Sequence, residues 1–497
     1  MAVIREFSIP QLISMKRAVR SVVAALVLLA GVAIGAGNLA AQAQNPSSAA
    51  NPFYGSVTAH PATDETLQLT LDDAVKRGLE NNLGLKQSEA IKKALDGEKL
   101  EAVQEFLPLI QLSGGTGVYQ HNLAALGFSQ SVFSKLGSFF PGGVVPPGLS
   151  TITRDDLTQG QLQFSQTLFS GPVLAGLKAA GAADKAAFYA KMSARGEVVQ
   201  QVATAYLHAL AAASEVDNAK ALEQSDQLTF NHAHDAHEAG TAANLDELRA
   251  RVQLQAQQQA LISAENALEK DLILLKREIG IAPGQRVALT DPTPNSELGA
   301  QTPEEVREIA YKYRQDYQNL LNQAVEYKAI HGAYRSYRLP TLTFEGYYGV
   351  SMVNDAGTHG NFAAQGTLSI PLFREAKLRG DVEAAQAQMD SVNDQLADLR
   401  THIDSQVRVA LLDVGATRQL VDVARSNVEL ATRTVSDETD RVNAGVDDNL
   451  PLVEAQSSLA SAENNLIESL YQYNLAKLAL ARASGVLETQ YRVYLGR

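Results

Sequence analysis

The stretch HEAGTAANLDELRARVQL (residues 237–254) recurs in altered form as VNAGVDDNLPLVEAQSSL (residues 442–459). In both stretches an Ala-Gly pair precedes Asn-Leu, and residues that favour helix follow. The two turn glycines, Gly240 and Gly445, are 205 residues apart. A turn that occurs twice in this way indicates that the chain contains two copies of one structural unit.

Other residues repeat at nearly constant spacing. A long insertion in the first copy, at residues 127–156, explains why the spacing falls from 232 residues to 204 or 205 along the chain. The sequence therefore predicts a first repeat at 67–290, a second repeat at 291–487 and a short C-terminal tail at 488–497. The matching pairs, in chain order, are Thr70 and Thr302, Pro108 and Pro340, Leu168-Phe169 and Leu372-Phe373, and Gly280 and Gly485.

Each copy passes through the same order of hydrophobic periods. In the first copy, residues 71–105 have a helical period, whereas 107–119 and 157–168 are predicted as strands. The helix predicted from Pro172 to Gly240 is about 100 Å long, and a shorter helix of about 36 residues returns from that turn. Glycine at such a helix end adopts the left-handed conformation without steric cost. Each copy should therefore end in a long helical hairpin.

Small and β-branched residues recur along the long helices with the 4-3-4-3 spacing of a coiled coil. Small side chains at a seam predict helices that pack closely side by side. A helical bundle alone would explain the seams but not the strands that precede them. The seams are Val198, Val202, Ala205, Ala209, Ala212, Val216 and Ala219 in the first copy, and Ile403, Val407, Ala410, Val414, Thr417, Val421 and Ala424 in the second.

Composition excludes several classes of protein. The net charge of −13 argues against nucleic acid as a partner. The absence of cysteine excludes disulfides, thiolate metal sites and a lipidated N-terminal cysteine. Residues 1–43, with a start possibly at Met15, are expected to be a signal peptide, and 44–66 an extended segment. The alternative for the N-terminus is a retained membrane helix; beyond it, no apolar run reaches the ~18 residues of a spanning helix.

The strands limit how the chain can cross a membrane. Each alternating stretch has about the 9–11 residues that a tilted membrane strand needs. Four strands cannot close a barrel, because even a small barrel takes about eight, and an open sheet in lipid would leave unpaired edges. A chain that crosses a membrane with these strands must therefore oligomerise. The predicted fold class is an α+β membrane protein built from a duplicated helix–strand–strand–long helical hairpin unit.

These features resemble the TolC-type outer-membrane efflux and secretion proteins. The resemblance covers residues 67–486 and depends on the duplicated order, on the two turns AG…NLDELRA and AG…NLPLVEA, and on LSIPLF at 368–373. It implies a homotrimer whose four strands per chain complete a twelve-stranded β-barrel in the outer-membrane lipid, above a long α-helical coiled-coil tunnel in the periplasm. It also implies a passive exit duct of a tripartite efflux or type I secretion system, docked onto a periplasmic adaptor (membrane fusion) protein and an inner-membrane pump of the RND, ABC or MFS type.

The alternative is a periplasmic coiled-coil scaffold or adaptor-like protein without a membrane barrel. No Walker-type phosphate loop and no catalytic constellation is visible, so we expect no enzyme activity and no cofactor. The turn residues do not select among drugs, metals, siderophores, lipids and proteins as the exported substrate.

The resemblance also points to residues of a pore constriction. In the family, acidic side chains ring the constriction just after the second turn, and Glu454 matches one of these positions. Pro451 occupies another, while Asp447 and Asp448 lie earlier, in the turn itself. A ring of carboxylates from three protomers would favour cations. Alternatively, acids in the first turn of a helix simply complement its dipole.

Two further sites are less clear from the sequence. Asp246 matches one partner of a polar link that closes some relatives, but Val442 and Asp447 occupy the positions of the expected tyrosine and arginine. His234 and His237 are three residues apart on a helix, so they are candidates for metal binding or pH sensing. The alternative is a solvated helix end at which imidazolium complements the dipole.

Overall fold

The computed structural model describes residues 51–57, 61–122, 132, 135, 152–241, 243–354, 357–444 and 449–496. The chain divides into two compact units, Met1–Asn51 and Pro52–Arg497, and every helix and strand described below belongs to the second unit. The predicted signal peptide, most of the insertion and the second turn with Gly445, Asp447 and Asp448 lie outside the described residues. In the part of the chain that is described, no helix is long and apolar enough to cross a membrane.

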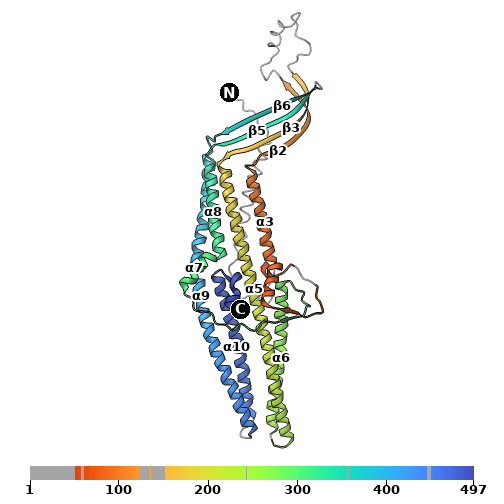
Figure 1. The fold of residues 1–497 in the computed structure, drawn as a ribbon, viewed down its shortest axis with the longest axis vertical. Helices are drawn as coiled ribbons and strands as arrows, with labels where there is room; N and C mark the ends of the chain where they lie inside the picture. Colours follow the sequence, from red (N-terminus) through yellow and green to blue (C-terminus); the bar gives the residue numbers. More distant parts are fainter. Residues whose placement is uncertain are drawn as a thin grey trace. The chain divides into compact units, whose positions relative to one another are not determined.

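The order of elements repeats along the chain, as Figure 1 shows. The first copy consists of β1 (Leu67–Leu69), α2 (Leu71–Asn81), α3 (Leu83–Gln104), β2 (Leu109–Asn122), β3 (Ile152–Ser170), α5 (Gly171–Glu238), α6 (Asn244–Ile279) and the short strand β4 (Val287–Leu289). The second consists of α7 (Pro303–Tyr313), α8 (Gln315–Ser336), β5 (Thr341–Val353), β6 (Thr358–Ser369), α9 (Glu375–Asn443) and α10 (Asn449–Ala483). Helices α5 and α9 have 68 and 69 residues, and α3 and α8 have 22 each. The predicted duplicated unit is therefore confirmed.

The single helix predicted at 71–105 is in fact two helices, α2 and α3, which are separated by Asn82. Asn82 has an extended backbone, and its side-chain oxygen accepts a hydrogen bond of 3.2 Å from the Leu85 N–H, which caps α3. Arg314 occupies the equivalent position between α7 and α8. The helical period was predicted correctly, but the break depends on a cap that periodicity does not reveal.

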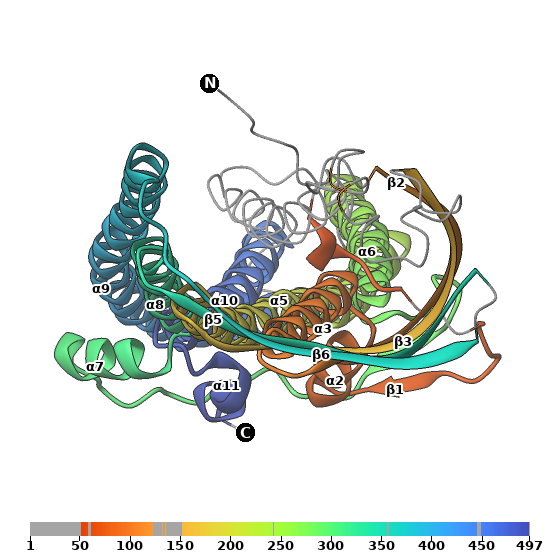
Figure 2. The ribbon, with the colours of Figure 1, turned by 90° about the horizontal axis from the view of Figure 1, so that it is seen from above.

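The predicted seams lie where the long helices pack. Helix α5 contacts α3, α6 and α8, while α9 contacts α8 and α10. In the first seam every predicted residue is buried except Ala205, which is half-buried, and Ala209 is completely inaccessible. Seen from above, α6 and α9 lie at opposite sides of the helices (Figure 2).

The four long strands form one antiparallel sheet in the order β2-β3-β5-β6. They lie together at one end of the long helices (Figure 1). Their register aligns one apolar residue from each strand in a row across the sheet, and each of the four side chains is 50–79% exposed. The row is Leu112, Leu162, Tyr348 and Phe362. The sheet therefore presents an apolar face that the described chain leaves uncovered.

The opposite face of the sheet is polar. The rows on the two sides of the apolar row point to this face; one contains Gln111, Gln163 and Tyr347, and the other contains Ser113 and Gln161. Strands β2 and β6 are the edges of this sheet, with 14 and 12 residues respectively. Within the described residues each edge strand pairs on one side only, so both present unpaired backbone groups.

The C-terminal tail contains a helix that the sequence did not predict, α11 (Leu487–Leu495). Leu487, Tyr491 and Leu495 are buried. The Tyr491 hydroxyl donates a hydrogen bond of 2.6 Å to Asp72 of α2. Helix α11 thus joins the beginning of the first copy to the end of the second.

Candidate functional site: the hairpin tips and their anchor

The first hairpin turns at Gly240, which has a φ of +71°. The Gly240 N–H donates to the His237 carbonyl, and the Thr241 N–H donates to the Ala236 carbonyl, both at 2.9 Å. This pair of bonds is the Schellman motif. A Cβ atom on Gly240 would meet nothing within 4 Å, so glycine is favoured here by the left-handed backbone and not by crowding.

Glu247, in the first turn of α6, is the polar centre of this tip. Its side chain is 12% exposed and lies 3.3 Å from His234 Nδ1 and 4.0 Å from His237 Nε2. An Arg251 guanidinium nitrogen lies 3.7 Å from the same carboxylate. The two predicted histidines therefore face an acid across the hairpin. Glu247 was not predicted from the sequence, because its only local signal is an acid in a first helical turn, which Asp246 shares.

The geometry of these side chains bears on metal binding. Phe230 stacks on the His234 ring with centroids 5.9 Å apart, which occupies one face of the imidazole. Across the described residues, no group of three or more His, Cys, Asp and Glu side chains could hold a metal ion. His234 and His237 both lie within 4.0 Å of Glu247, and His234 also contacts Phe230 and Glu238 of α5.

The predicted inter-hairpin partner Asp246 forms its ion pair within its own helix. Its carboxylate lies 3.4 Å from Arg249, three residues later. Val442, at the position expected for tyrosine, is a half-buried apolar residue. Among the contacts that the structure records, Asp246 therefore has no part in a link between the hairpins.

On the second hairpin, Glu454 lies in the early part of α10 and is exposed, whereas Leu452 and Ala455 on either side of it are buried. Its backbone carbonyl accepts a hydrogen bond of 2.8 Å from Ser458. The carboxylate of Glu454 therefore projects from the packed surface of the hairpin and is available to groups outside the protomer.

Gln456 provides a link between the two hairpins that the sequence did not predict. It is 5% exposed, and its amide donates to Ser225 at 3.3 Å and to Thr229 at 3.0 Å, both on α5. Farther from the tips, Asn218 donates to Asn464 at 3.1 Å. A glutamine beside the buried apolar positions of α10 was the available signal, but only tertiary structure shows its partners.

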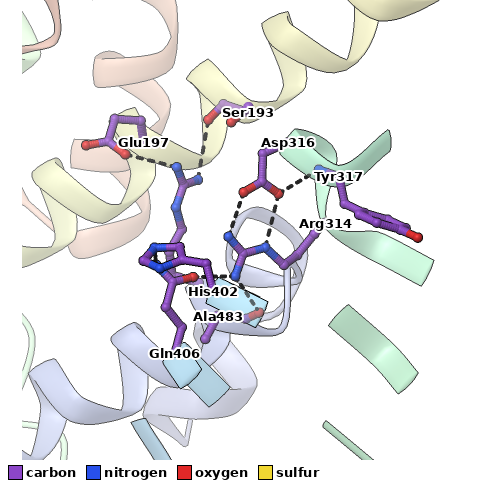
Figure 3. A network of polar contacts seen from close by, with 9 residues as sticks. Ser193, Glu197, Arg314, Asp316, Tyr317, His402, Gln406 and Ala483 are labelled. Carbon is purple, nitrogen blue, oxygen red and sulfur yellow. Dashed lines mark hydrogen bonds and ion pairs between the residues drawn. The ribbon is translucent and has the colours of Figure 1, made fainter. Parts of the chain in front are cut away.

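The hairpins are anchored at their other end by a polar network around Arg314 (Figure 3). Two of its guanidinium nitrogens donate to the two carboxylate oxygens of Asp316, at 3.0 and 2.6 Å. A third donates to Gln406 of α9 and, at 3.3 Å, to the Ala483 carbonyl of α10. Burial alone would raise the pKa of Asp316, but the hydrogen bonds and the charge of Arg314, together with the Tyr317 N–H and the nearby charge of Arg482, outweigh burial and hold that pKa below its usual value.

The same network reaches α5 through Arg482, whose guanidinium donates to the Ser193 carbonyl at 3.3 Å and to Glu197 at 2.9 Å. Four helices of both repeats thus meet at a set of charge-assisted hydrogen bonds. Because this network links helices of both repeats, we expect it to be the point about which the second hairpin would rotate against the first.

The segment between β4 and α7 fastens α10 as well. Tyr473 accepts a hydrogen bond from the Leu298 N–H at 3.0 Å, and Asn474 donates to the Pro294 carbonyl at 2.9 Å. Lys477 is fully buried and donates to the Ser296 carbonyl at 3.2 Å. Burial lowers the pKa of Lys477 to about 8.

A family model described as outer membrane efflux protein matches residues 74–280 and 326–486, which is most of both repeats. The chain belongs to the outer membrane efflux protein family. Members of this family reside in the outer membrane, and this protein is accordingly an outer-membrane efflux channel whose long helices extend into the periplasm. Among curated proteins, none matches the sequence.

Several solved outer-membrane channels share the fold. The CmeC outer membrane channel of Campylobacter jejuni is 16% identical, with 91% of this chain and 94% of that chain covered and a TM-score of 0.66. VceC from Vibrio cholerae is 16% identical, with 84% and 96% covered and a TM-score of 0.64. The MtrE channel of Neisseria gonorrhoeae, solved in its open state, is 16% identical, with 87% and 95% covered and a TM-score of 0.65. The resemblance inferred from the sequence is therefore confirmed.

Proposed function

We propose that this outer-membrane efflux channel is the passive exit duct of a tripartite efflux or type I secretion system. It works as a homotrimer that receives substrate from a periplasmic adaptor and an inner-membrane pump. The observation that carries the proposal is the exposed apolar face of a four-stranded sheet whose two edge strands lack partners among the described residues.

The edges of the sheet require other copies of the chain. In lipid, backbone groups of an open edge have no water to bond, so a spanning sheet must close on itself. Strand β6 of one copy can pair with β2 of the next, and this head-to-tail contact closes a ring. Three copies contribute twelve strands, enough for a barrel with an open lumen.

The long helices support the same ring. Successive residues of a helix are turned by ~100° about its axis. On this basis the exposed apolar residues of α6 lie on one side of that helix, within an arc of about 100°, and those of α9 do the same on their helix. They are Leu245, Leu248, Val252, Ile262 and Ile273 on α6, and Val409, Leu412, Leu420, Val423 and Leu430 on α9. Because α6 and α9 lie at opposite sides of the protomer (Figure 2), α6 of one copy can pack on α9 of the next.

The hairpin tips form the gate in this proposal. Three copies of Glu454, supplemented by Asp447 and Asp448, form a negative ring at the narrow end of the tunnel and favour cations. Asp246 adds a carboxylate on the first hairpin. The closed state is held by Gln456 with Ser225 and Thr229, and not by the tyrosine and arginine of other family members.

Cross-linking in mild detergent tests the assembly. The expected products of the mature protein stop at the trimer, and planar bilayers that contain it should show discrete ion conductance. A stable monomer with intact strand content would refute the closed ring. The matched control is the same protein cross-linked after full denaturation, which should give monomer alone.

Fractionation separates this proposal from the periplasmic scaffold. An outer-membrane duct is extracted only with detergent, whereas a scaffold is released with the periplasmic contents. The exposed apolar row of the sheet favours the duct, because a water-soluble scaffold would bury or replace those side chains. Recovery of the mature protein in the soluble periplasm would favour the scaffold.

A further inference from the structure

The two repeats differ at the junction between the sheet and the long helices. In the second repeat, Leu372 and Phe373 follow β6 and are 92% and 93% exposed. The matching dipeptide of the first repeat, Leu168 and Phe169, lies inside β3 and is 51% and 42% exposed. Phe169 pairs with Leu342 in the sheet, whereas β6 is an edge strand that ends at Ser369. One copy of the dipeptide is therefore held in the sheet while the other projects from it.

Five cations lie on the segments next to the projecting dipeptide, at the end of α8 and at the beginning of α9. At the matching positions of the first repeat, 232 or 204 residues earlier, there is no cation. The five residues, all exposed, are Arg335 and Arg338 near the end of α8, Arg374 in the connection, and Lys377 and Arg379 in the beginning of α9. Their counterparts are Val103, Phe106, Ser170, Val173 and Ala175. The charge belongs to the same copy as the exposed dipeptide, so the two features form one surface.

The cations are only partly neutralised within the chain. Glu375 lies 2.9 Å from both Arg338 and Arg379, and Asp381 lies 2.7 Å from Lys377. These pairs are exposed, so each stabilises little and can exchange for a stronger anion. The Arg374 guanidinium lies 5.9 Å from the centroid of the Tyr337 ring and forms no ion pair with a described residue.

We propose that this surface, the basic collar (Arg335, Arg338, Leu372, Phe373, Arg374, Lys377 and Arg379), binds anionic phospholipid of the membrane leaflet that faces the periplasm. Leu372 and Phe373 insert among the acyl chains, as aromatic residues do at membrane interfaces. The guanidinium and ammonium groups hold the phosphate, for which arginine offers bidentate hydrogen bonds. Clusters of Lys and Arg beside a spanning segment attract anionic lipid in this way. The inference rests on the proposed placement of the sheet in lipid.

Geometry favours lipid over a neighbouring copy as the occupant. Leu368 lies on the same apolar face of the sheet as Phe362, and the exposed side chains of Ile370 and Leu372 follow directly after the strand ends. The cations lie both on α9, at the side of the protomer, and on α8, which packs between α5 and α9. The collar therefore reaches beyond the side that another copy would cover. The competing occupant is the end of α3 in the next copy, where Glu101 and Glu105 are exposed.

The experiment measures lipid binding to the detergent-purified, delipidated oligomer by native mass spectrometry. Phosphatidylglycerol and phosphatidylcholine are titrated in parallel. The wild type is expected to prefer phosphatidylglycerol, and the variant Arg374→Gln/Lys377→Gln/Arg379→Gln should lose at least about tenfold of that preference. The control Lys270→Gln/Arg408→Gln/Arg433→Gln removes the same charge from exposed positions on the hairpins and should keep it.

Further measurements separate phospholipid from inorganic phosphate and from a neighbouring copy. The charge-preserving variant Arg374→Lys/Arg379→Lys should retain the preference, and inorganic phosphate at matched concentration should not displace the lipid. Displacement by inorganic phosphate would reduce the collar to a general anion site and overturn the proposal. The proposal would also be overturned if the collar variant and the variant Glu101→Gln/Glu105→Gln both dissociated into monomers to the same extent. That result would show that the collar binds the end of α3 in the next copy.

Conductance of the same samples keeps the two proposals distinct. A collar variant that conducts normally yet keeps its full lipid preference overturns the lipid site and leaves the channel intact. A wild type that binds phosphatidylglycerol but never conducts overturns the channel and leaves the lipid site intact.

Discussion

The substitutions Gly485→Ala and Gly240→Ala test whether the anchor at the base of the hairpins is as tightly built as its contacts indicate. Both glycines end a helix in the left-handed conformation, with φ of +77° and +71°. A Cβ atom on Gly485 would lie 2.6 Å from Arg314 N, 2.7 Å from Arg314 Cα and 2.8 Å from Tyr313 C, all backbone atoms. A Cβ atom on Gly240 would touch nothing within 4 Å.

These surroundings set the expected magnitudes. The left-handed conformation costs a residue with a Cβ atom about 1–2 kcal/mol at either position. At Gly485 the collision adds about 1–3 kcal/mol, the usual cost of overpacking. Relief would require Arg314 to move, and its side chain is tied to Asp316 and to the Ala483 carbonyl. We therefore expect Gly485→Ala to lower the free energy of unfolding by about 2–5 kcal/mol and Gly240→Ala by about 1–2 kcal/mol.

Guanidinium unfolding of the detergent-solubilised protein, followed by circular dichroism, measures the difference. Asparagine variants separate the two causes, because asparagine tolerates the left-handed conformation but keeps a Cβ atom. Gly240→Asn should be close to wild type, whereas Gly485→Asn should remain strongly destabilised. Equal destabilisation by the two alanine variants would show that the anchor yields to the added atom, and the argument for a rigid pivot would fail.

Four other changes give sharp outcomes. Ala209→Leu places a larger side chain at a fully buried seam position and should destabilise the protein by about 1–3 kcal/mol in the same unfolding assay; an unchanged midpoint would contradict the close packing. Glu454→Gln should lower cation selectivity in planar bilayers and weaken the block by multivalent cations. The triple variant Glu454→Gln/Asp447→Asn/Asp448→Asn should lower the selectivity and the block further. If the selectivity and the block survive in the triple variant, these acids lie away from the lumen. Gln456→Ala removes the amide between the hairpins and should raise the open fraction of single-channel recordings, with no change expected if the hairpins separate elsewhere. Asp226 is a buried residue of α5, and burial raises its pKa in the folded protein to about 6, above its pKa in the unfolded chain. The stability of the folded state is therefore greatest at pH values below the pKa of the unfolded chain, and it falls as the pH rises through about 6. Asp226→Asn should accordingly stabilise the protein at pH 7 by up to about 3 kcal/mol and leave it nearly unchanged below pH 4; a pH-independent effect would contradict this.

Local patterns in the sequence were enough for the order of elements. Helical and strand periods, the turn glycines and the spacing between matching residues are properties of neighbouring positions, which is why the 68 residues of α5 and the 36 of α6 were predicted closely. The duplication also identified the family, because the same order of elements occurs twice. The break at Asn82 and helix α11 were missed, since a cap and a docked terminal helix depend on partners from distant parts of the chain.

The candidate site was predicted less completely than the fold. Sequence position brought Asp246 and Glu454 to the hairpin ends, but the burial of Glu247 between two histidines and the contacts of Gln456 join residues that the helical period cannot relate. Which side chains meet at the tips depends on which helices face each other, and packing between the hairpins decides that arrangement.

The Leu-Phe dipeptides show most directly what the sequence by itself determined and what only tertiary structure decided. The sequence placed both copies at equivalent positions of the duplicated unit, because their spacing repeats. It could not tell them apart, since identical dipeptides have identical local preferences. The structure separates them because, among the described residues, β3 has a partner strand on each side and β6 has one on one side only, so Phe169 is held in the sheet while Phe373 projects from it.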